Sequence, residues 1–127
     1  DSRAYFFLAD GSVQRLTKDH SFVQHLIDLN EITEEEAAVH PQKNIILKAV
    51  GQSESYTPDI QTIAVPQGST LLLCSDGLWG VVSEDEMNTE IQYMADPIET
   101  SRKLVNLANQ AGGPDNMSVI LIKYPVF

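Results

Sequence analysis

Strand-like segments stand at the beginning, in the middle and at the end of this chain, and helix signals occupy the spaces between them. Helices that come in pairs between strands, rather than alternating with single strands, favour an α+β fold with antiparallel pairing. Antiparallel strands can follow one another through short turns and need no crossover helix. The strand-like segments are residues 3–8, 12–16, 60–65, 71–74 and 118–124.

Two of these segments carry specific local signals. Asp10-Gly11 lies between residues 3–8 and 12–16, and this dipeptide readily adopts the positive φ angles of a tight hairpin turn. Residues 71–74 read Leu-Leu-Leu-Cys, a continuous apolar run short enough for a strand. The sequence therefore predicts a hairpin at the start and, at residues 71–74, a strand buried on both faces.

Four helix starts are predicted by capping residues that are followed by acidic or amide side chains. A Ser, Thr or Asp oxygen at such a position accepts from a backbone N–H of the first turn, and in a capping box a Glu or Gln reaches back. We expect Ile98 to belong to the buried stripe of the last helix, and residues 42–57 to form loop and short strand. The predicted helix starts are Ser21, Thr33, Ser83 and Asp96, and the last helix stops at Gly112-Gly113.

Composition limits the classes of function. At 127 residues and 43% hydrophobic, the chain has the size of one globular domain. A net charge of −10 argues against nucleic acid or an anionic membrane surface as partner. One cysteine, Cys74, cannot form an internal disulfide, which suits a reducing, cytoplasmic compartment. There is no apolar run of the roughly 18 residues that a membrane span needs.

Two loops place a carboxylate beside glycines at the ends of predicted strands. Asp76 follows the apolar run in Cys74-Ser75-Asp76-Gly77, and Asp115 precedes the last strand in Gly112-Gly113-Pro114-Asp115-Asn116. Carboxylate oxygens suit the hard cations Mg²⁺ and Mn²⁺. Each loop also has an ordinary structural interpretation, because Asp-Gly forms turns and Gly-Gly ends helices. From the residues alone both interpretations stay open.

Other reactive residues lack a supporting context. The histidines at 20, 25 and 40 have no metal-ligand spacing, and solvated or capping roles are favoured for them. Cys74 lies in an apolar run, which is typical of an inert core thiol. Ser75 has no Ser-His-Asp context, so a serine nucleophile is not indicated.

Taken together, four motifs in chain order resemble those of a known family. The motifs are Asp1-Ser2-Arg3-Ala4-Tyr5, Asp19-His20-Ser21, Cys74-Ser75-Asp76-Gly77-Leu78-Trp79 and Gly112-Gly113-Pro114-Asp115-Asn116-Met117-Ser118. In order and spacing they resemble the C-terminal half of a PP2C-type (PPM) metal-dependent serine/threonine protein phosphatase, most closely its bacterial members. The resemblance implies part of an αββα sandwich, two antiparallel sheets packed face to face with helix pairs outside.

The resemblance also implies a chemistry and its residues. The family hydrolyses phosphoserine and phosphothreonine in proteins with a metal-activated water, at a binuclear Mn²⁺ or Mg²⁺ centre, so no side chain serves as the nucleophile. Asp76 and Asp115 match metal ligands, and Asp1 matches the aspartate that shares a third, weaker metal with Asp76. Asn116 and Gly77 would support their neighbouring ligands.

The same resemblance implies what this chain lacks. Residues 21–57 fall where the family carries its mobile flap, and Lys48 stands where relatives often have Arg, so no substrate role is assigned to it. The Asp-Gly-X-Gly-Gly segment that supplies bridging ligands in the family's first half has no match here. We therefore expect the N-terminal half to be the partner of this chain, and the chain alone to be inactive.

Two rival interpretations belong to other classes. The chain could be a non-catalytic, phosphatase-like protein-binding module, although Asp1, Asp76 and Asp115 are all retained. It could also form oligomers through sheet edges left without a neighbour.

Overall fold

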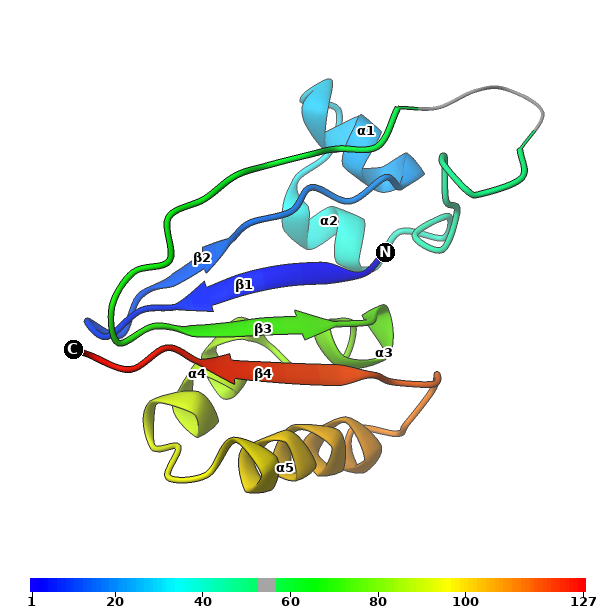
Figure 1. Ribbon diagram of the computed structural model, residues 1–127. Helices are drawn as coiled ribbons and strands as arrows, with labels where there is room; N and C mark the ends of the chain where they lie inside the picture. The colour runs from blue at the N-terminus through cyan, green and yellow to red at the C-terminus, as the bar shows by residue number, and fades with distance from the viewer. Residues whose placement is uncertain (53–56) are drawn as a thin grey trace. The chain divides into compact units, whose positions relative to one another are not determined.

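The computed structural model describes residues 1–52 and 57–127, which form two compact units (Figure 1). One unit comprises Asp1 and residues 18–63, and the other comprises residues 2–17 and 64–127. The larger unit, residues 2–17 and 64–127, contains the sheet and both candidate loops. Each unit is described by itself.

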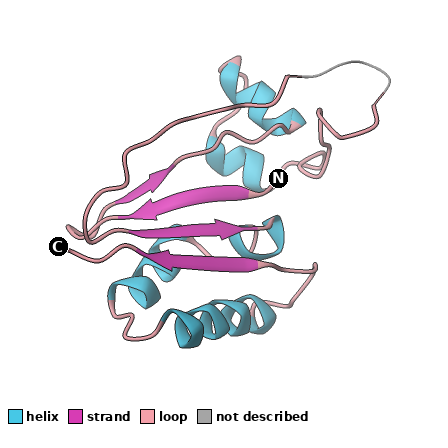
Figure 2. Cartoon of the chain, viewed as in Figure 1, coloured by secondary structure: helices cyan, strands magenta, loops and turns pink. Residues whose placement is uncertain are grey.

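A four-stranded antiparallel sheet organises the larger unit, with strand order β2-β1-β3-β4 (Figure 2). Its first two strands form the predicted hairpin, in which Gly11 has a φ of 88° and Asp10 Oδ1 accepts from Ser12 N at 2.9 Å. The segments 3–8, 12–16, 71–74 and 118–124 are confirmed as strands. Their bounds are β1 (Arg3–Phe7), β2 (Val13–Arg15), β3 (Thr70–Cys74) and β4 (Val119–Lys123).

Three helices of the larger unit cover one face of this sheet (Figure 1). They are α3 (Asp76–Trp79), α4 (Glu84–Gln92) and α5 (Pro97–Gln110). The starts of α4 and α5 are as predicted. Ser83 and Glu86 form a complete capping box, and Asp96 Oδ1 accepts from Ile98 N at 2.9 Å.

The core lies between these helices and the sheet. Strand side chains that point to the helices are Tyr5, Phe7, Leu72 and Cys74, all buried. They meet helix and loop residues that are equally buried, namely Leu78, Val82, Met87, Ile91, Leu104 and Ala108. Ile98 was expected in this core but is 63% exposed, because it lies on the side of α5 away from the sheet. That expectation is wrong.

The opposite face of the sheet is apolar and partly exposed. Leu73 in β3 pairs with Ile120 in β4, and their exposed fractions are 38% and 55%; Ile122 is 50% exposed. The prediction that residues 71–74 are buried on both faces is therefore wrong for this structure. Burial alternates along β3, with Thr70, Leu72 and Cys74 covered by helices.

The strand predicted at residues 60–65 does not form. Residues 57–66 have no regular secondary structure, and Ile60 is 87% exposed. A strand needs hydrogen bonds to a neighbour, and no described strand pairs with this segment. Its alternating apolar pattern is therefore not sufficient for a strand.

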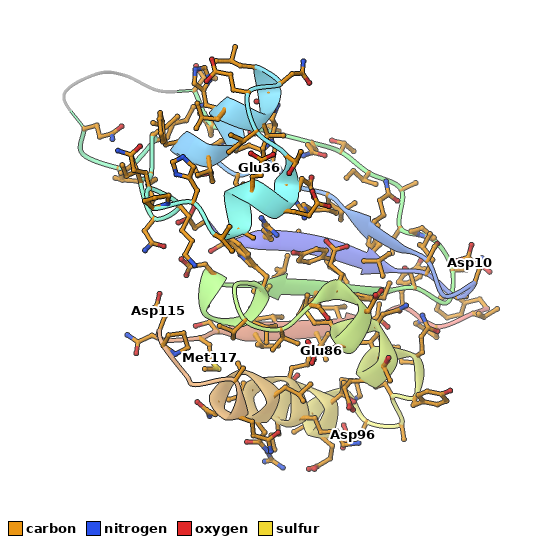
Figure 3. The ribbon with its side chains drawn as sticks, turned by 180° about the vertical axis from the view of Figure 1, so that it is seen from behind. Asp10, Glu36, Glu86, Asp96, Asp115 and Met117 are labelled. Atoms are coloured by element: carbon orange, nitrogen blue, oxygen red, sulfur yellow. The ribbon has the colours of Figure 1, made fainter. Side chains whose placement is uncertain are left out.

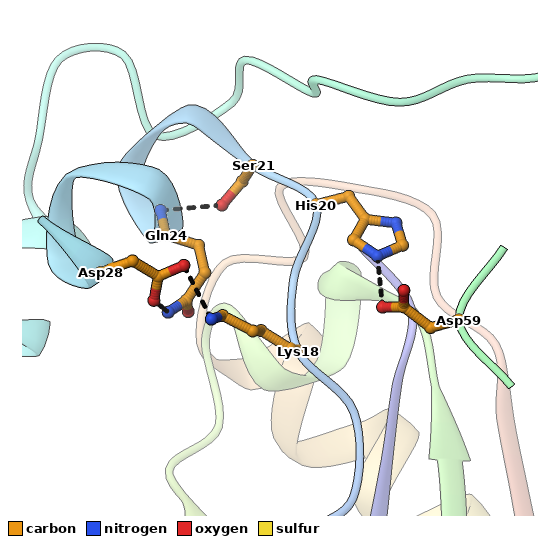
Figure 4. Close-up of polar contacts among 6 residues, drawn as sticks. All are labelled: Lys18, His20, Ser21, Gln24, Asp28 and Asp59. Carbon is orange, nitrogen blue, oxygen red and sulfur yellow. Dashed lines mark hydrogen bonds and ion pairs between the residues drawn. The ribbon is translucent and has the colours of Figure 1, made fainter. Parts of the chain in front are cut away.

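The smaller unit contains the predicted helical pair, α1 (Phe22–Asp28) and α2 (Glu34–Ala38). Ser21 Oγ accepts from Gln24 N and Thr33 Oγ1 accepts from Glu36 N, both at 3.2 Å, so both starts are confirmed. The Gln24 amide, expected to reach back to Ser21, instead donates to Asp28 (Figure 4).

Polar contacts join loop segments of the smaller unit to α1 and to one another (Figure 4). Lys18 Nζ lies 2.7 Å from Asp28 Oδ2, and His20 Nε2 lies 2.7 Å from Asp59 Oδ2. The His20 contact lowers the pKa of Asp59. The short strand predicted within residues 42–57 amounts to one bridge, Ser21 to Ile46, and residues 53–56 lie outside the described part of the chain.

No helix in residues 1–52 and 57–127 has the length and hydropathy needed to cross a bilayer.

Candidate metal centre

The antiparallel pairing of β3 and β4 places the two candidate loops at the same end of the sheet (Figure 1). The last residue of β3, Cys74, is paired with the first residue of β4, Val119. Asp76 comes two residues after Cys74, and Asp115 comes four residues before Val119. Loops separated by about forty residues of sequence therefore meet because of strand register alone.

Ser75 and Ser118 connect the two loops directly beyond the strands. Ser75 N donates to Ser118 O at 3.1 Å, and Ser118 N donates to Ser75 Oγ at 2.9 Å. In the second bond the Ser75 hydroxyl replaces a backbone carbonyl as acceptor, because the β3–β4 backbone pairing has already ended at Cys74 and Val119. Sequence reasoning excluded Ser75 as a nucleophile but did not find this connecting role, because its partner is 43 residues away.

Gly77 brings the backbones of the two loops into contact. A Cβ built on Gly77 would lie 2.1 Å from the backbone oxygen of Asn116 and 3.1 Å from Met117 Cβ. The backbone of Gly77 has no positive φ, so the glycine is required by this close approach and not by its own conformation. The start of α3 therefore packs directly on the loop that follows Asp115.

Asp76 starts a one-turn helix, whereas the sequence pattern indicated a loop. Ser75 is the N-cap of α3 and Gly80 N donates to Asp76 O at 2.9 Å. Asp76 is half-buried, and Leu78 two residues later is fully buried in the core. The core thus anchors the segment that carries the carboxylate.

Asp115 projects from the exposed loop between α5 and β4 (Figure 3). Its Oδ1 accepts from Asn116 N at 2.7 Å, so the neighbouring backbone restrains the carboxylate. Gly112 and Gly113 have φ of 114° and 53°, and Gly113 N bonds to Ala108 O at 3.0 Å. The helix-stop interpretation is therefore confirmed for the two glycines, and Asp115 lies beyond them.

The donor set fits a hard divalent cation in kind but not in number. Asp76 and Asp115 supply carboxylate oxygens from adjoining loops, and such oxygens are what Mn²⁺ and Mg²⁺ prefer. The described residues contain no group of three or more His, Cys, Asp or Glu side chains that could hold a metal ion. Asp1 belongs to the other compact unit, so its predicted shared site with Asp76 stays a prediction.

Cys74 borders this end of the sheet but is buried in the core. Burial raises the pKa of its thiol to about 11, although the nearby Arg3 acts in the opposite direction. A thiol with that pKa is protonated at neutral pH and is a poor nucleophile. This agrees with the expectation of an inert core cysteine.

Comparison with known proteins gives consistent results from sequence and structure. No family model matches the chain. A protein of Streptococcus pyogenes named "Putative protein phosphatase 2C-type" is 40% identical over 113 residues, which are 89% of this chain and 46% of that protein. The solved structure of the S. agalactiae serine/threonine phosphatase superposes with a TM-score of 0.91 at 37% identity, over 98% of this chain and 51% of that one.

The chain belongs to the PP2C-type, or PPM, phosphatase family. The antiparallel sheet with helices on one face matches the PPM fold, as the resemblance implies. Another PPM structure, the catalytic domain of the phosphatase PstP, was solved in complex with two manganese ions. It has 36% identity and a TM-score of 0.82 over 95% of this chain and 49% of that one. The chain spans about half the length of these PPM relatives, which is consistent with a C-terminal half.

Proposed function

We propose that this chain is the C-terminal half of a metal-dependent phosphatase domain that hydrolyses phosphoserine and phosphothreonine in proteins. The observation that carries the proposal is the junction of the Asp76 and Asp115 loops through Ser75, Ser118 and Gly77. A turn and a helix stop do not need such a junction, whereas two carboxylates that serve one cation site do. The names of the PPM relatives support the substrate class.

The residues of this chain would hold the metals from one side. Asp76, positioned by the core through α3, and Asp115, restrained at Oδ1 by Asn116 N, would be the ligands. Bound Mn²⁺ or Mg²⁺ would lower the pKa of a water molecule, orient the phosphate and offset its charge. Asp1 would contribute to a third, weaker site. Asn116 and Gly77 would support the ligands.

Further ligands would have to come from the rest of the domain. Two carboxylates are too few for two hard cations, each of which takes about six ligands. The exposed apolar side chains of Leu73, Ile120 and Ile122 also support a missing half of the domain, because a second sheet could pack on them. That packing would complete the αββα sandwich. We propose that the chain without its N-terminal half does not hydrolyse phosphoproteins.

The test uses the complete domain, assembled from this chain and the N-terminal half of a PPM relative. Hydrolysis of a phosphothreonine peptide is measured against Mn²⁺ concentration, and Mn²⁺ binding is measured by electron paramagnetic resonance. Asp76→Asn and Asp115→Asn should each weaken Mn²⁺ binding and lower activity by at least about 100-fold. The matched control, Asp85→Asn on the exposed first turn of α4, should change neither.

Two results would contradict the proposal. An Asp76→Asn domain that binds Mn²⁺ and turns over like the parent would show that this carboxylate is only a helix-start residue. A complete, folded domain that binds phosphopeptide but never hydrolyses it would favour the protein-binding module instead.

A further inference from the structure

The helix that carries Asp76 is too short to hold its own orientation. α3 spans Asp76–Trp79, a single turn, and the first turn of a helix is unfavourable to form without outside support. Its direction must therefore be set by what its side chains contact. Each of the three residues after Asp76 has a different contact.

Two of these contacts belong to the site and core already described. Gly77 packs on the backbone of Asn116, and Leu78 is fully buried among core side chains. These two contacts restrain α3 on the side of the loop before β4 and on the side of the core. The third residue, Trp79, is partly buried against the same core and has a further contact.

Trp79 is covered by a cation from β1. The Arg3 Cζ atom lies 3.5 Å from the centre of the Trp79 ring, which is close contact between a guanidinium and an aromatic face. Arg3 Nη1 also donates to the hydroxyl of Tyr5 at 3.1 Å, and Tyr5 is fully buried. Arg3 itself is paired with Cys74, the last residue before the Asp76 loop.

The chemistry of arginine suits this position. A guanidinium is planar, so it stacks on the indole while an N–H in its plane reaches the Tyr5 oxygen. One side chain thereby links the start of β1, the buried Tyr5 and the end of α3. Lysine can keep the positive charge over the ring, but it lacks the planar guanidinium that also donates to Tyr5.

We propose that Arg3 is a positioning residue for the metal ligand Asp76, acting through Trp79. The proposal rests on the proposed function, because it assigns Arg3 to the orientation of a metal-binding carboxylate. The Arg3–Trp79 stack fixes the end of α3, and the rigid single turn transmits that position to Asp76 at its start. Loss of the stack lets α3 tilt, which spoils the ligand geometry while the fold remains.

The experiment measures Mn²⁺ binding and catalysis separately in the complete domain. Arg3→Met removes the charge and the guanidinium, whereas Arg3→Lys keeps the charge alone. Trp79→Phe keeps an aromatic ring of smaller size. Arg102→Met is the matched control, since Arg102 lies on the exposed face of α5 and pairs only locally with Glu99 at 2.6 Å in the described bonds. Circular dichroism confirms folding at the assay temperature.

Arg3→Met should raise the Kd for Mn²⁺ about tenfold, the lower end of the effect of groups that orient metal ligands. Arg3→Lys should raise the Kd for Mn²⁺ less than Arg3→Met does. Trp79→Phe should raise this Kd about threefold. At saturating Mn²⁺ each kcat should return to within about twofold of the parent, with KM for the peptide unchanged. A role in folding alone would lower the unfolding temperature without moving the Mn²⁺ isotherm of the folded protein.

Unchanged Mn²⁺ affinity in folded Arg3→Met would overturn the inference. Where Arg3→Met does not fold, Arg3→Lys and Trp79→Phe decide, and parental Mn²⁺ affinity in both overturns it. The proposed function is judged by Asp76→Asn instead. If Asp76→Asn loses Mn²⁺ and the Arg3 variants do not, only the positioning role fails.

Discussion

Replacing Gly77 by alanine adds one methyl group at the point where the two aspartate loops meet. Its Cβ would lie 2.1 Å from Asn116 O and 2.9 Å from Asn116 C, both backbone atoms that cannot rotate away. Real Cβ contacts do not fall below 3.0 Å, so the loops must separate by at least 3.0 − 2.1 = 0.9 Å. A shift of that size would also break the 2.9 Å bond from Ser118 N to Ser75 Oγ if it is transmitted there.

Local helix propensity and tertiary packing predict opposite signs for this change. Alanine in place of glycine within a helix stabilises by up to about 1 kcal/mol. Overpacking against a fixed backbone costs about 1–3 kcal/mol. The middle of the packing cost less the helix gain leaves a net loss of about 1 kcal/mol. A displacement near 1 Å at a catalytic centre lowers activity by about 100-fold.

The assay is urea unfolding of the metal-free complete domain, followed by the Mn²⁺ isotherm and peptide hydrolysis. Gly11→Ala is the control, because Gly11 has a φ of 88° but no atom within 4 Å of its Cβ position. It should lose stability through backbone strain and keep parental Mn²⁺ affinity. A Gly77→Ala domain that is as stable as the parent, or more stable, with unchanged Mn²⁺ binding would refute the junction as described.

Three further predictions concern the sheet and α4. Ile120→Asp should destabilise the complete domain by about 3 kcal/mol or more, since it would bury a charge under the second sheet. Ile98→Asp, at a site that is 63% exposed, should change the stability little. If calorimetry gave the same shift in unfolding temperature for Ile120→Asp and Ile98→Asp, the result would count against the sandwich. Ser83→Ala should cost about 1 kcal/mol in urea unfolding. Hydrogen bonds from Ser83, backbone first, lower the pKa of Glu86, so the stability that Glu86 adds is present above pH 4.5 and lost as pH falls through its folded pKa. Glu86→Gln should therefore be less stable than the parent at pH 7, and its deficit should shrink as the pH falls through the folded pKa of Glu86. A deficit that does not change with pH would contradict the capping box.

Local interactions account for the features that the sequence predicted well. The hairpin at Asp10-Gly11 and the helix starts at Ser21, Ser83 and Asp96 depend on residues within four positions of one another. Such contacts form wherever the backbone brings neighbours together, so the pattern alone indicates them. The family and the candidate carboxylates were also predictable, because motif identity and order are sequence properties.

Features that depend on distant partners were not predictable in the same way. The segment 60–65 has a strand pattern but no described neighbour, so it stays irregular. Leu73 lies in an apolar run yet is 38% exposed, because α3, α4 and α5 pack on the other face of the sheet. The pattern records which surfaces are suited to burial, whereas actual burial requires the partner.

The sequence by itself determined which residues are available for chemistry: two hard carboxylates, Asp76 and Asp115, each beside glycines at the end of a strand. Only the tertiary structure decided that their loops adjoin, because the register of Cys74 with Val119 sets which loops meet. It also assigned Gly77 to the junction and Arg3 to the ring of Trp79. These assignments are contacts across 39 and 76 residues of chain respectively, and no local pattern specifies the partner at such separations.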